Sequence, residues 1–266
     1  MDDSRRSFLR SVGCAVLGAG CGLPLLGAAG KALLDSPPPA GEENVAGTKR
    51  WGLVIDLAKC RGEEVRRACR EACDREHNVP RMPDPKEEIK WIWSEEYENV
   101  FADQAHPYTA DSWKGSPVLV LCNHCAHPAC TKVCPTEATW KRAEDGIVMM
   151  DMHRCIGCRY CVAACPYGAR SFNWRDPRPY IETIRPEYPT RTKGVVEKCN
   201  FCAERLREGR EPACVEAARA APGGGEALTF GDLADPQSQV SRLLRQKYTI
   251  CRRPSLGTGP SVFYIV

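Results

Sequence analysis

The sequence predicts an α+β fold with short strands, many loops and a C-terminal helix. The chain has 266 residues, of which 43% are hydrophobic and 27% are charged, so one or two packed domains are expected. Its seventeen cysteines are grouped at short spacings, which favours metal or cluster ligation over a disulfide scaffold. A formal charge of +3 gives no basic footprint for nucleic acid, so no nucleic-acid partner is expected.

The first segment, residues 1–32, is predicted to be a twin-arginine signal peptide. Arg5 and Arg6 stand in SRRSFLR, before a weakly apolar, glycine-rich run over 12–26. At about 15 residues, this run is shorter than the roughly 20 that a spanning helix needs. The twin-arginine route exports folded proteins, which suits a chain that acquires its cofactor in the cytoplasm. A periplasmic location is therefore expected, with an uncleaved anchor as the alternative.

The rest of the chain is divided into a connector and a packed domain. Residues 33–48 contain a proline triplet and polar residues that cannot form a core, so they are predicted to be a flexible connector. The domain is expected over 49–266. Its predicted strands are 51–56, 146–151 and 261–266. A helix is predicted over 235–247, with Asp235 as its cap and Pro236 at its first position.

Two internal repeats organise the cysteines. The repeats pair four segments, namely 55–73 with 150–165 and 122–135 with 199–219. In the first pair Glu63 stands where Cys158 lies, and in the second pair Ala218 stands where Cys134 lies. The four motifs therefore contain fourteen cysteines, two fewer than four complete motifs would have.

Residues 155–166 have the C-x2-C-x2-C-x3-C-P spacing of two-cluster ferredoxins, and residues 122–135 have the same pattern with four residues between the second and third cysteines. Each [4Fe–4S] cube there takes four thiolates, and the fourth cysteine of a run ligates the other cube. The chain is therefore predicted to contain tandem bacterial-ferredoxin-like 4Fe-4S modules, with the motifs read as crossed pairs. The complete sets are set 1 (Cys122, Cys125, Cys130 and Cys165), set 2 (Cys155, Cys158, Cys161 and Cys134) and set 3 (Cys199, Cys202, Cys214 and Cys73).

A fourth set is incomplete. It would comprise Cys60, Glu63, Cys69 and Ala218, so both missing thiols fall on one site. We therefore expect three [4Fe–4S] clusters, with the fourth lost and with Cys60 and Cys69 kept as a structural remnant. A disulfide or a solvated thiol pair is the alternative for these two. Zinc competes for a single C-x2-C pair, but two intact four-cysteine runs favour iron.

Other residues are expected to surround the clusters. His124 is interpreted as a neighbour of its cluster rather than a ligand, and Cys251 as a buried small residue. Four aromatic residues are expected to pack and keep water away: Trp140, Tyr160, Tyr167 and Trp174. Four basic residues are expected to offset cluster charge, or else to form a solvated face: Arg154, Arg159, Arg170 and Lys198.

The four-motif pattern resembles the periplasmic iron–sulfur subunits that work beside quinone-interacting membrane proteins, a group that includes NrfC-like and DMSO-reductase-type subunits. Within that group the chain is most similar to the DsrO family of the DsrMKJOP complex, which is associated with dissimilatory sulfite reductase. The resemblance is carried by KRWGLVIDLAKC, REHNVP, EIKWIW, CNHCAHPAC, HRCIGCRYCVAACPYGARSFNW, RTKGVVEKCNFC and FGDLADP. It covers nearly all of the chain after the connector.

The resemblance implies an electron-transfer subunit with no catalytic residue. Single electrons would pass between an NrfD-like quinone-interacting membrane subunit and a periplasmic multihaem cytochrome c subunit, and the chain would be peripheral to the inner membrane through its complex. Residues 49–266 contain no C-x-x-C-H motif, no complete dinucleotide fingerprint and no spanning segment, so haem and quinone are expected on partners. The alternatives are a relay for a molybdopterin reductase of the DMSO or polysulfide type, and a zinc-stabilised or disulfide-bonded binding module.

Overall fold

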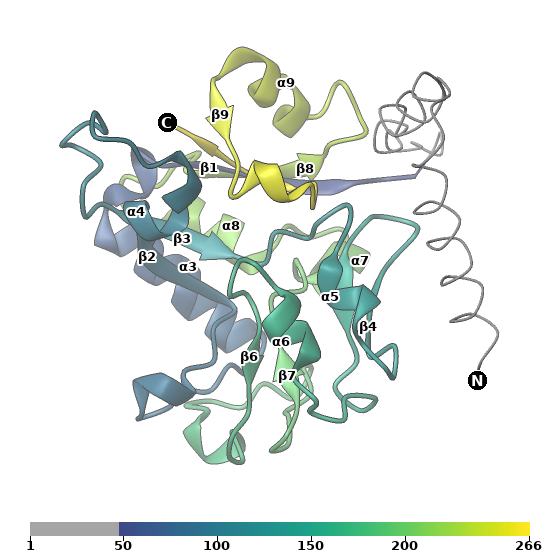
Figure 1. The fold of residues 1–266 in the computed structure, drawn as a ribbon. Helices are drawn as coiled ribbons and strands as arrows, with labels where there is room; N and C mark the ends of the chain where they lie inside the picture. The colour runs from purple at the N-terminus through teal and green to yellow at the C-terminus, as the bar shows by residue number, and fades with distance from the viewer. Residues whose placement is uncertain (1–47) are drawn as a thin grey trace, which may run out of the picture. The chain divides into compact units, whose positions relative to one another are not determined.

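A four-stranded sheet joins the two ends of the domain. The computed structural model describes residues 48–266, so the expected signal peptide and nearly all of the connector lie outside the described residues. Strand β1 (Trp51–Asp56) pairs in parallel with β10 (Val262–Ile265) and antiparallel with β8 (Leu228–Asp232). Strand β9 (Thr249–Ile250) completes the order β8-β1-β10-β9. Figure 1 shows this sheet and helix α9 (Gln239–Gln246) above the rest of the domain.

Strand β1 is apolar because both of its faces are covered. Leu53, Val54 and Ile55 are each at most 1% exposed, as expected for a central strand with elements on both sides. Tyr264 of β10 is equally buried, and its ring lies edge-on to Phe101 at 5.2 Å. This layer forms the part of the core on which the cysteine motifs are built.

Three antiparallel ribbons extend from this sheet. Their pairs are β2 (Ile92–Glu96) with β3 (Pro117–Leu121), β4 (Thr139–Lys141) with β5 (Val148–Met150), and β6 (Ser171–Phe172) with β7 (Val196–Glu197). Each cysteine motif begins just after a strand. Cys60 follows β1, Cys122 follows β3, Cys155 follows β5 and Cys199 follows β7. The strand fixes where each loop starts, and the loop then directs its thiols inward.

A helix follows the start of each motif and carries at least one of its later cysteines. These helices are α3 (Glu63–Glu76), α5 (Ala129–Lys132), α6 (Tyr160–Ala164) and α8 (Ala213–Ala220). Helix α3 packs against α8, and α5 packs against α6. Each packed pair therefore joins one helix of the first repeat to one helix of the second, which agrees with the crossed pairing of the motifs.

The remaining elements connect these units. They are α4 (Tyr97–Val100), α7 (Ala203–Arg207), and the 3-10 turns η2 (Lys59–Arg61), η3 (Pro85–Glu87), η4 (Ala102–Gln104), η5 (Arg178–Tyr180) and η6 (Pro254–Leu256). Within residues 48–266, no helix has the length and apolar character that crossing a bilayer requires.

The predicted strands are confirmed as β1, β5 and β10, but the predicted start of the last helix is wrong. Helix α9 begins at Gln239, and its N-cap is Ser238, whose hydroxyl accepts a hydrogen bond from the Ser241 amide at 3.1 Å. Asp235 instead accepts from the Gln237 amide at 2.8 Å and closes a turn before the helix. Aspartate and serine are both favourable N-cap residues. The turn that Asp235 closes comes first, so Ser238 becomes the N-cap of α9.

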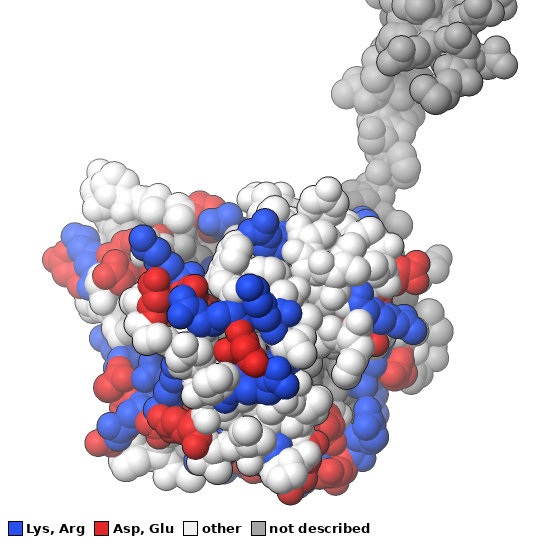
Figure 2. All heavy atoms as spheres, turned by 90° about the horizontal axis from the view of Figure 1, so that it is seen from below, with Lys and Arg blue, Asp and Glu red and all other residues white. Residues whose placement is uncertain are grey.

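Charges of both signs are mixed on the face seen from below in Figure 2. The loops at this end carry ion pairs that link distant segments, including Arg81 with Glu182 at 2.6 Å and Arg175 with Glu87 at 2.6 Å. Exposed pairs of this kind contribute little stability individually. They fix the long connection between β6 and β7 to the segment that follows α3.

Candidate iron–sulfur centres

The motif loops need backbone conformations that direct successive thiols to one side. His124 and Phe201, the third residues of the two C-N-x-C motifs, both adopt positive φ angles, of 41° and 54°. Gly157 of C-I-G-C has a φ of 70°, and a Cβ there would lie 2.3 Å from the carbonyl oxygen of Gly194. This position therefore requires glycine, since any side chain would push the loop away from the β7 side.

Set 1 is brought together by α5 and by the end of α6. Burial, with smaller contributions from the charges of Cys122, Cys130 and Cys165, raises the pKa of the Cys125 thiol to about 12. The fourth member, Cys165, follows α6 and comes from the other intact motif. Four thiols from two motifs thus lie near one another, which is the donor arrangement of a [4Fe–4S] cube.

Set 2 lines a small pocket. Its walls include all four predicted members, together with Met150, Ile156 and Val196. Burial raises the pKa of Cys134, but hydrogen bonds from Thr139, Thr136 and Ala138 outweigh that effect and lower the pKa overall. A thiol whose anion is stabilised in this way is well suited to bind iron, because the thiolate is the ligand form.

Set 3 lies deepest in the domain. The four thiols line a small pocket whose apolar walls include Leu53, Phe201 and Phe230; they belong to Cys73, Cys199, Cys202 and Cys214. All four thiols are at most 8% exposed. Burial raises the pKa of Cys73 well above its usual value, and the charges of the other three raise it further. Metal uptake must therefore displace bound protons, as is usual for buried cysteine sites.

The three sets occur in a defined order. The charge of Cys122 in set 1 raises the pKa of Cys199 in set 3, after the larger effect of burial. The charge of Cys130 in set 1 likewise raises the pKa of Cys161 in set 2. Set 1 is therefore the neighbour of both others, and the order is set 3, set 1, set 2.

His124 lies between sets 1 and 3. Its ring stacks on Phe201 with centroids 3.7 Å apart, and its Nδ1 accepts a hydrogen bond from the Val148 amide at 3.1 Å. Burial lowers the pKa of His124 well below its usual value, and the charges of Lys198 and Arg170 lower it further. The imidazole is therefore neutral and packs beside the thiol sets.

The incomplete fourth set contains two buried thiols. Cys60 and Cys69 are free; the Cys60 thiol points to the Ala227 carbonyl at 3.8 Å, and the Cys69 thiol to the Cys214 carbonyl at 3.4 Å. Burial raises the pKa of each to about 12. The Glu63 side chain is 65% exposed and pairs with Arg66 at 2.6 Å, so it does not turn toward the two thiols.

The chain closes tightly over the other lost position. Ala218 is fully buried on α8, and a Cβ added to Gly224 would lie 1.9 Å from the Ala218 carbonyl oxygen. Helix α8 packs directly against α3 here. The turn after α8 therefore lies against the backbone of Ala218 and has no room for a side chain at Gly224.

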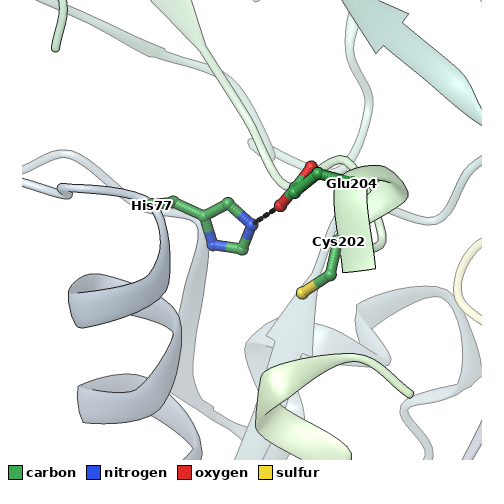
Figure 3. A group of neighbouring side chains, drawn as sticks. All are labelled: His77, Cys202 and Glu204. Carbon is green, nitrogen blue, oxygen red and sulfur yellow. Dashed lines mark hydrogen bonds and ion pairs between the residues drawn. The ribbon is translucent and has the colours of Figure 1, made fainter. Parts of the chain in front are cut away.

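A histidine and a glutamate beside set 3 were not assigned from the sequence. His77 Nε2 lies 2.7 Å from Glu204 Oε1, and His77 Nδ1 lies 3.1 Å from the Cys73 carbonyl oxygen. Figure 3 shows the His77 ring directed at Glu204, with the sulfur of Cys202 pointing away from the carboxylate. These three residues could hold a single metal ion, but Cys202 also belongs to set 3, so the two uses exclude each other. The spacing of His77, four residues after Cys73 on one helix face, was the available signal.

The basic and aromatic neighbours divide into buried and exposed groups. Arg170 and Lys198 are 5% and 2% exposed, whereas the Arg154 side chain is 63% exposed. The expectation that all four aromatic residues shield the clusters was wrong, because only Tyr167 is buried. Cys251 is half-buried rather than buried. The exposed aromatic residues are Trp140, Tyr160 and Trp174.

Comparisons with known proteins agree with this site. Residues 117–178 match the 4Fe-4S dicluster domain family, and this range contains sets 1 and 2. The chain is 40% identical to the Hdr-like menaquinol oxidoreductase iron–sulfur subunit 1 of Archaeoglobus fulgidus, over 98% of this chain and 97% of that protein. It is 38% identical to the menaquinone reductase iron–sulfur cluster-binding subunit of Nitratidesulfovibrio vulgaris, over 81% of this chain and 88% of the relative.

A third relative is the iron–sulfur subunit of the arsenate respiratory reductase of a Shewanella species, which is 36% identical over 81% of this chain and 96% of its own length. The chain belongs to the family of 4Fe-4S iron–sulfur subunits that serve oxidoreductase complexes. Within that family it is similar, over almost its whole length, to the protein from A. fulgidus.

Proposed function

We propose that the chain is an electron relay in which sets 1, 2 and 3 each hold a [4Fe–4S] cluster. The observation that carries this proposal is the row of three complete thiol sets, with set 1 between the other two. Clusters of this type accept and release single electrons, so a row of them suits transfer across a protein. No catalytic residue is required in this function.

The chain's own groups are suited to hold and tune such clusters. Backbone amides point at three of the proposed ligands: Val196 at Cys155 (3.5 Å), Phe201 at Cys199 (3.4 Å) and Ala213 at Cys202 (3.4 Å). Hydrogen bonds to ligand sulfur are one of the main determinants of cluster potential. The apolar wall of set 3 excludes water, whereas three of the four thiols in each of sets 1 and 2 are half-buried.

The surface beside set 2 fits contact with a redox partner. Ile156, Tyr160 and Trp174 are 66%, 62% and 46% exposed, and the first two are direct neighbours of proposed ligands. Exposed apolar groups clustered in this way are typical of interaction sites. The Arg159 guanidinium adds a positive charge to this surface, 4.8 Å from the Trp174 ring, so the partner surface is expected to be acidic.

We propose that the partners are an NrfD-like quinone-interacting membrane subunit and a multihaem cytochrome c, in a sulfite-reductase-associated complex of the DsrMKJOP type. Two relatives are named as subunits of a menaquinol oxidoreductase and of a menaquinone reductase, and these names support a quinone-interacting partner. The twin-arginine motif at Arg5 and Arg6 supports export and a periplasmic location. The cytochrome follows from the resemblance to the DsrO family.

Anaerobic purification of the chain with its native complex tests this function. We expect about twelve irons per chain, on the basis of four per cube, and brown absorption that bleaches on reduction by a quinol. A membrane subunit and a haem-containing subunit should co-purify. Colourless protein that contains zinc would contradict the relay and favour a zinc-stabilised module.

A second candidate is a relay for a molybdopterin reductase. The match to the iron–sulfur subunit of an arsenate respiratory reductase, over 96% of that protein, favours it. The same purification separates the two candidates, because a large reductase subunit would then co-purify in place of a cytochrome. The clusters and their thiol sets would be the same in either case.

A further inference from the structure

Arg170 is a buried cation at a proposed cluster ligand. The residue is only 5% exposed. Its Nη2 donates hydrogen bonds to Cys130 Sγ at 3.0 Å and to Thr139 Oγ1 at 2.8 Å. Its Nη1 lies 3.7 Å from the sulfur of Met150. The guanidinium is therefore held in place by three contacts and has little access to water.

No carboxylate pairs with Arg170 within residues 48–266. Two other buried arginines have such partners: Arg191 pairs with Glu197, and Arg205 with Glu76. Burying a charge without a counterion costs a large free energy. The groups of opposite charge that reach Arg170 are thiolates, and they come from both intact motifs: Cys130 and Cys122 in set 1, and Cys161 in set 2.

We propose that Arg170 is a fixed positive charge shared by sets 1 and 2, which raises the reduction potential of both clusters. The proposal rests on the assignment of clusters to these two sets. Each electron that enters a cluster adds a negative charge, and a nearby buried cation stabilises that charge because screening by water is weak. One residue thereby makes both sites easier to reduce, and electrons can pass between them without a large energy step.

The charge can be distinguished from the hydrogen bond. Arg170 hydrogen-bonds to Cys130 of set 1 and also to Cys161 of set 2, so both effects reach both sets; Arg170→Lys separates them, because it keeps the charge and changes the hydrogen-bond geometry. Set 3 offers an internal reference, since Arg170 is not among the groups that shift the pKa of Cys73. Arg154 is a matched control, because it is adjacent to Cys155 but its side chain is 63% exposed.

The test is an anaerobic redox titration of the iron-loaded protein, followed by electron paramagnetic resonance, for the wild type, Arg170→Gln, Arg170→Lys and Arg154→Gln. In Arg170→Gln the equilibrium constants for reduction of the clusters in sets 1 and 2 should each fall at least about tenfold. This corresponds to a reduction potential lower by about 59 mV for one electron. Set 3 should not change. Arg170→Lys and Arg154→Gln should stay within about threefold of the wild type, since the first keeps the charge and solvent screens the second.

Three results would overturn the proposal. They are a shift of set 1 alone, an equal tenfold fall in Arg170→Lys and Arg170→Gln, and normal potentials in Arg170→Gln with full iron content. If Arg170→Gln does not load iron, Arg170→Lys decides: potentials near the wild type support the fixed charge, and a tenfold fall contradicts it. Wild-type protein without iron would instead refute the proposed relay itself.

Discussion

His124 stacks on Phe201 with ring centroids 3.7 Å apart and an interplanar angle of 18°. The two residues occupy equivalent positions in C-N-H-C and C-N-F-C, so the contact joins the two copies of one sequence repeat. The contact also joins set 1 to set 3. His124 lies in the loop between Cys122 and Cys125 of set 1, and Phe201 lies in the loop between Cys199 and Cys202 of set 3. The repeat therefore produces a packed bridge where two proposed clusters approach each other.

Removing this bridge should destabilise the domain. Phe201 is 2% exposed, so Phe201→Ala should cost about 3–5 kcal/mol through lost burial and the cavity that remains. Anaerobic thermal unfolding with iron analysis would measure the effect. Phe172→Ala, at a half-buried ring, serves as the control and should cost clearly less. Equal losses in the two variants would show that the stacked pair has no special role.

The crossed pairing predicts opposite outcomes for two cysteines one helical turn apart. Cys73→Ala should lower the iron content from about twelve to about eight per chain, because set 3 would lose a ligand, while Cys69→Ala should keep the full content. Elemental analysis of anaerobically purified variants measures this. The reverse outcome, with iron lost only from Cys69→Ala, would mean that Cys60 and Cys69 hold a cluster through a ligand that the geometry does not indicate.

Asp74 predicts a pH dependence of stability. Burial raises its pKa from 3.8 to about 7, although Arg81 lies 3.8 Å away and opposes the shift. A carboxyl whose pKa is raised by folding contributes stability that is fully present below pH 3.8 and is lost as the pH rises through 7. At pH 8 the native protein therefore contains an unfavourably buried charge.

Asp74→Asn should consequently stabilise the protein at pH 8 by about 2 kcal/mol, or about 5 °C in apparent Tm, and should have little effect near pH 4. Thermal scans of the iron-loaded protein across this range would show it. Glu71→Gln, on the same helix with its side chain 47% exposed, should give no pH-dependent gain. An equal gain for Asp74→Asn at both pH values would contradict the burial of its charge.

The apolar surface beside set 2 should matter for electron exchange and not for cluster binding. Ile156→Asp places a charge on a residue that is 66% exposed, so iron content should be unchanged while the electron-transfer rate with the co-purified partner falls at least about tenfold. Stopped-flow absorption would measure this rate. Tyr248→Asp changes a residue that is 78% exposed elsewhere, and its rate should match the wild type. Equal effects would place the partner at another surface.

The proposed twin-arginine signal peptide predicts where the protein accumulates. Changing both Arg5 and Arg6 to lysine should retain the chain in the cytoplasm with its iron bound, because the twin-arginine route requires that pair. Cell fractionation with immunodetection measures the distribution, and Arg10→Lys is the control in the same segment. Normal periplasmic accumulation of the double variant would exclude this export route.

Cysteine spacing by itself determined which thiols should meet. The repeats predicted three sets and an incomplete fourth, and the structure brings the members of each complete set near one another; their ligation of iron stays a prediction. Spacing is informative here because the first two thiols of a C-x2-C loop can reach one centre together, and the recurrence of that spacing identifies the equivalent thiols of the other motifs. The strands β1, β5 and β10 were likewise visible, since runs of apolar residues between turns have few alternative structures.

Tertiary structure alone decided the order of the sets and the environment of each side chain. Arg154 and Arg170 both lie near cysteines in the sequence, yet one is solvated and the other is enclosed, because burial depends on segments that pack from elsewhere in the chain. His77 meets Glu204 only because α3 and the start of α7 converge on set 3. Local sequence fixes the shape of a loop, but the distance between residues a hundred positions apart is set by how the whole core closes.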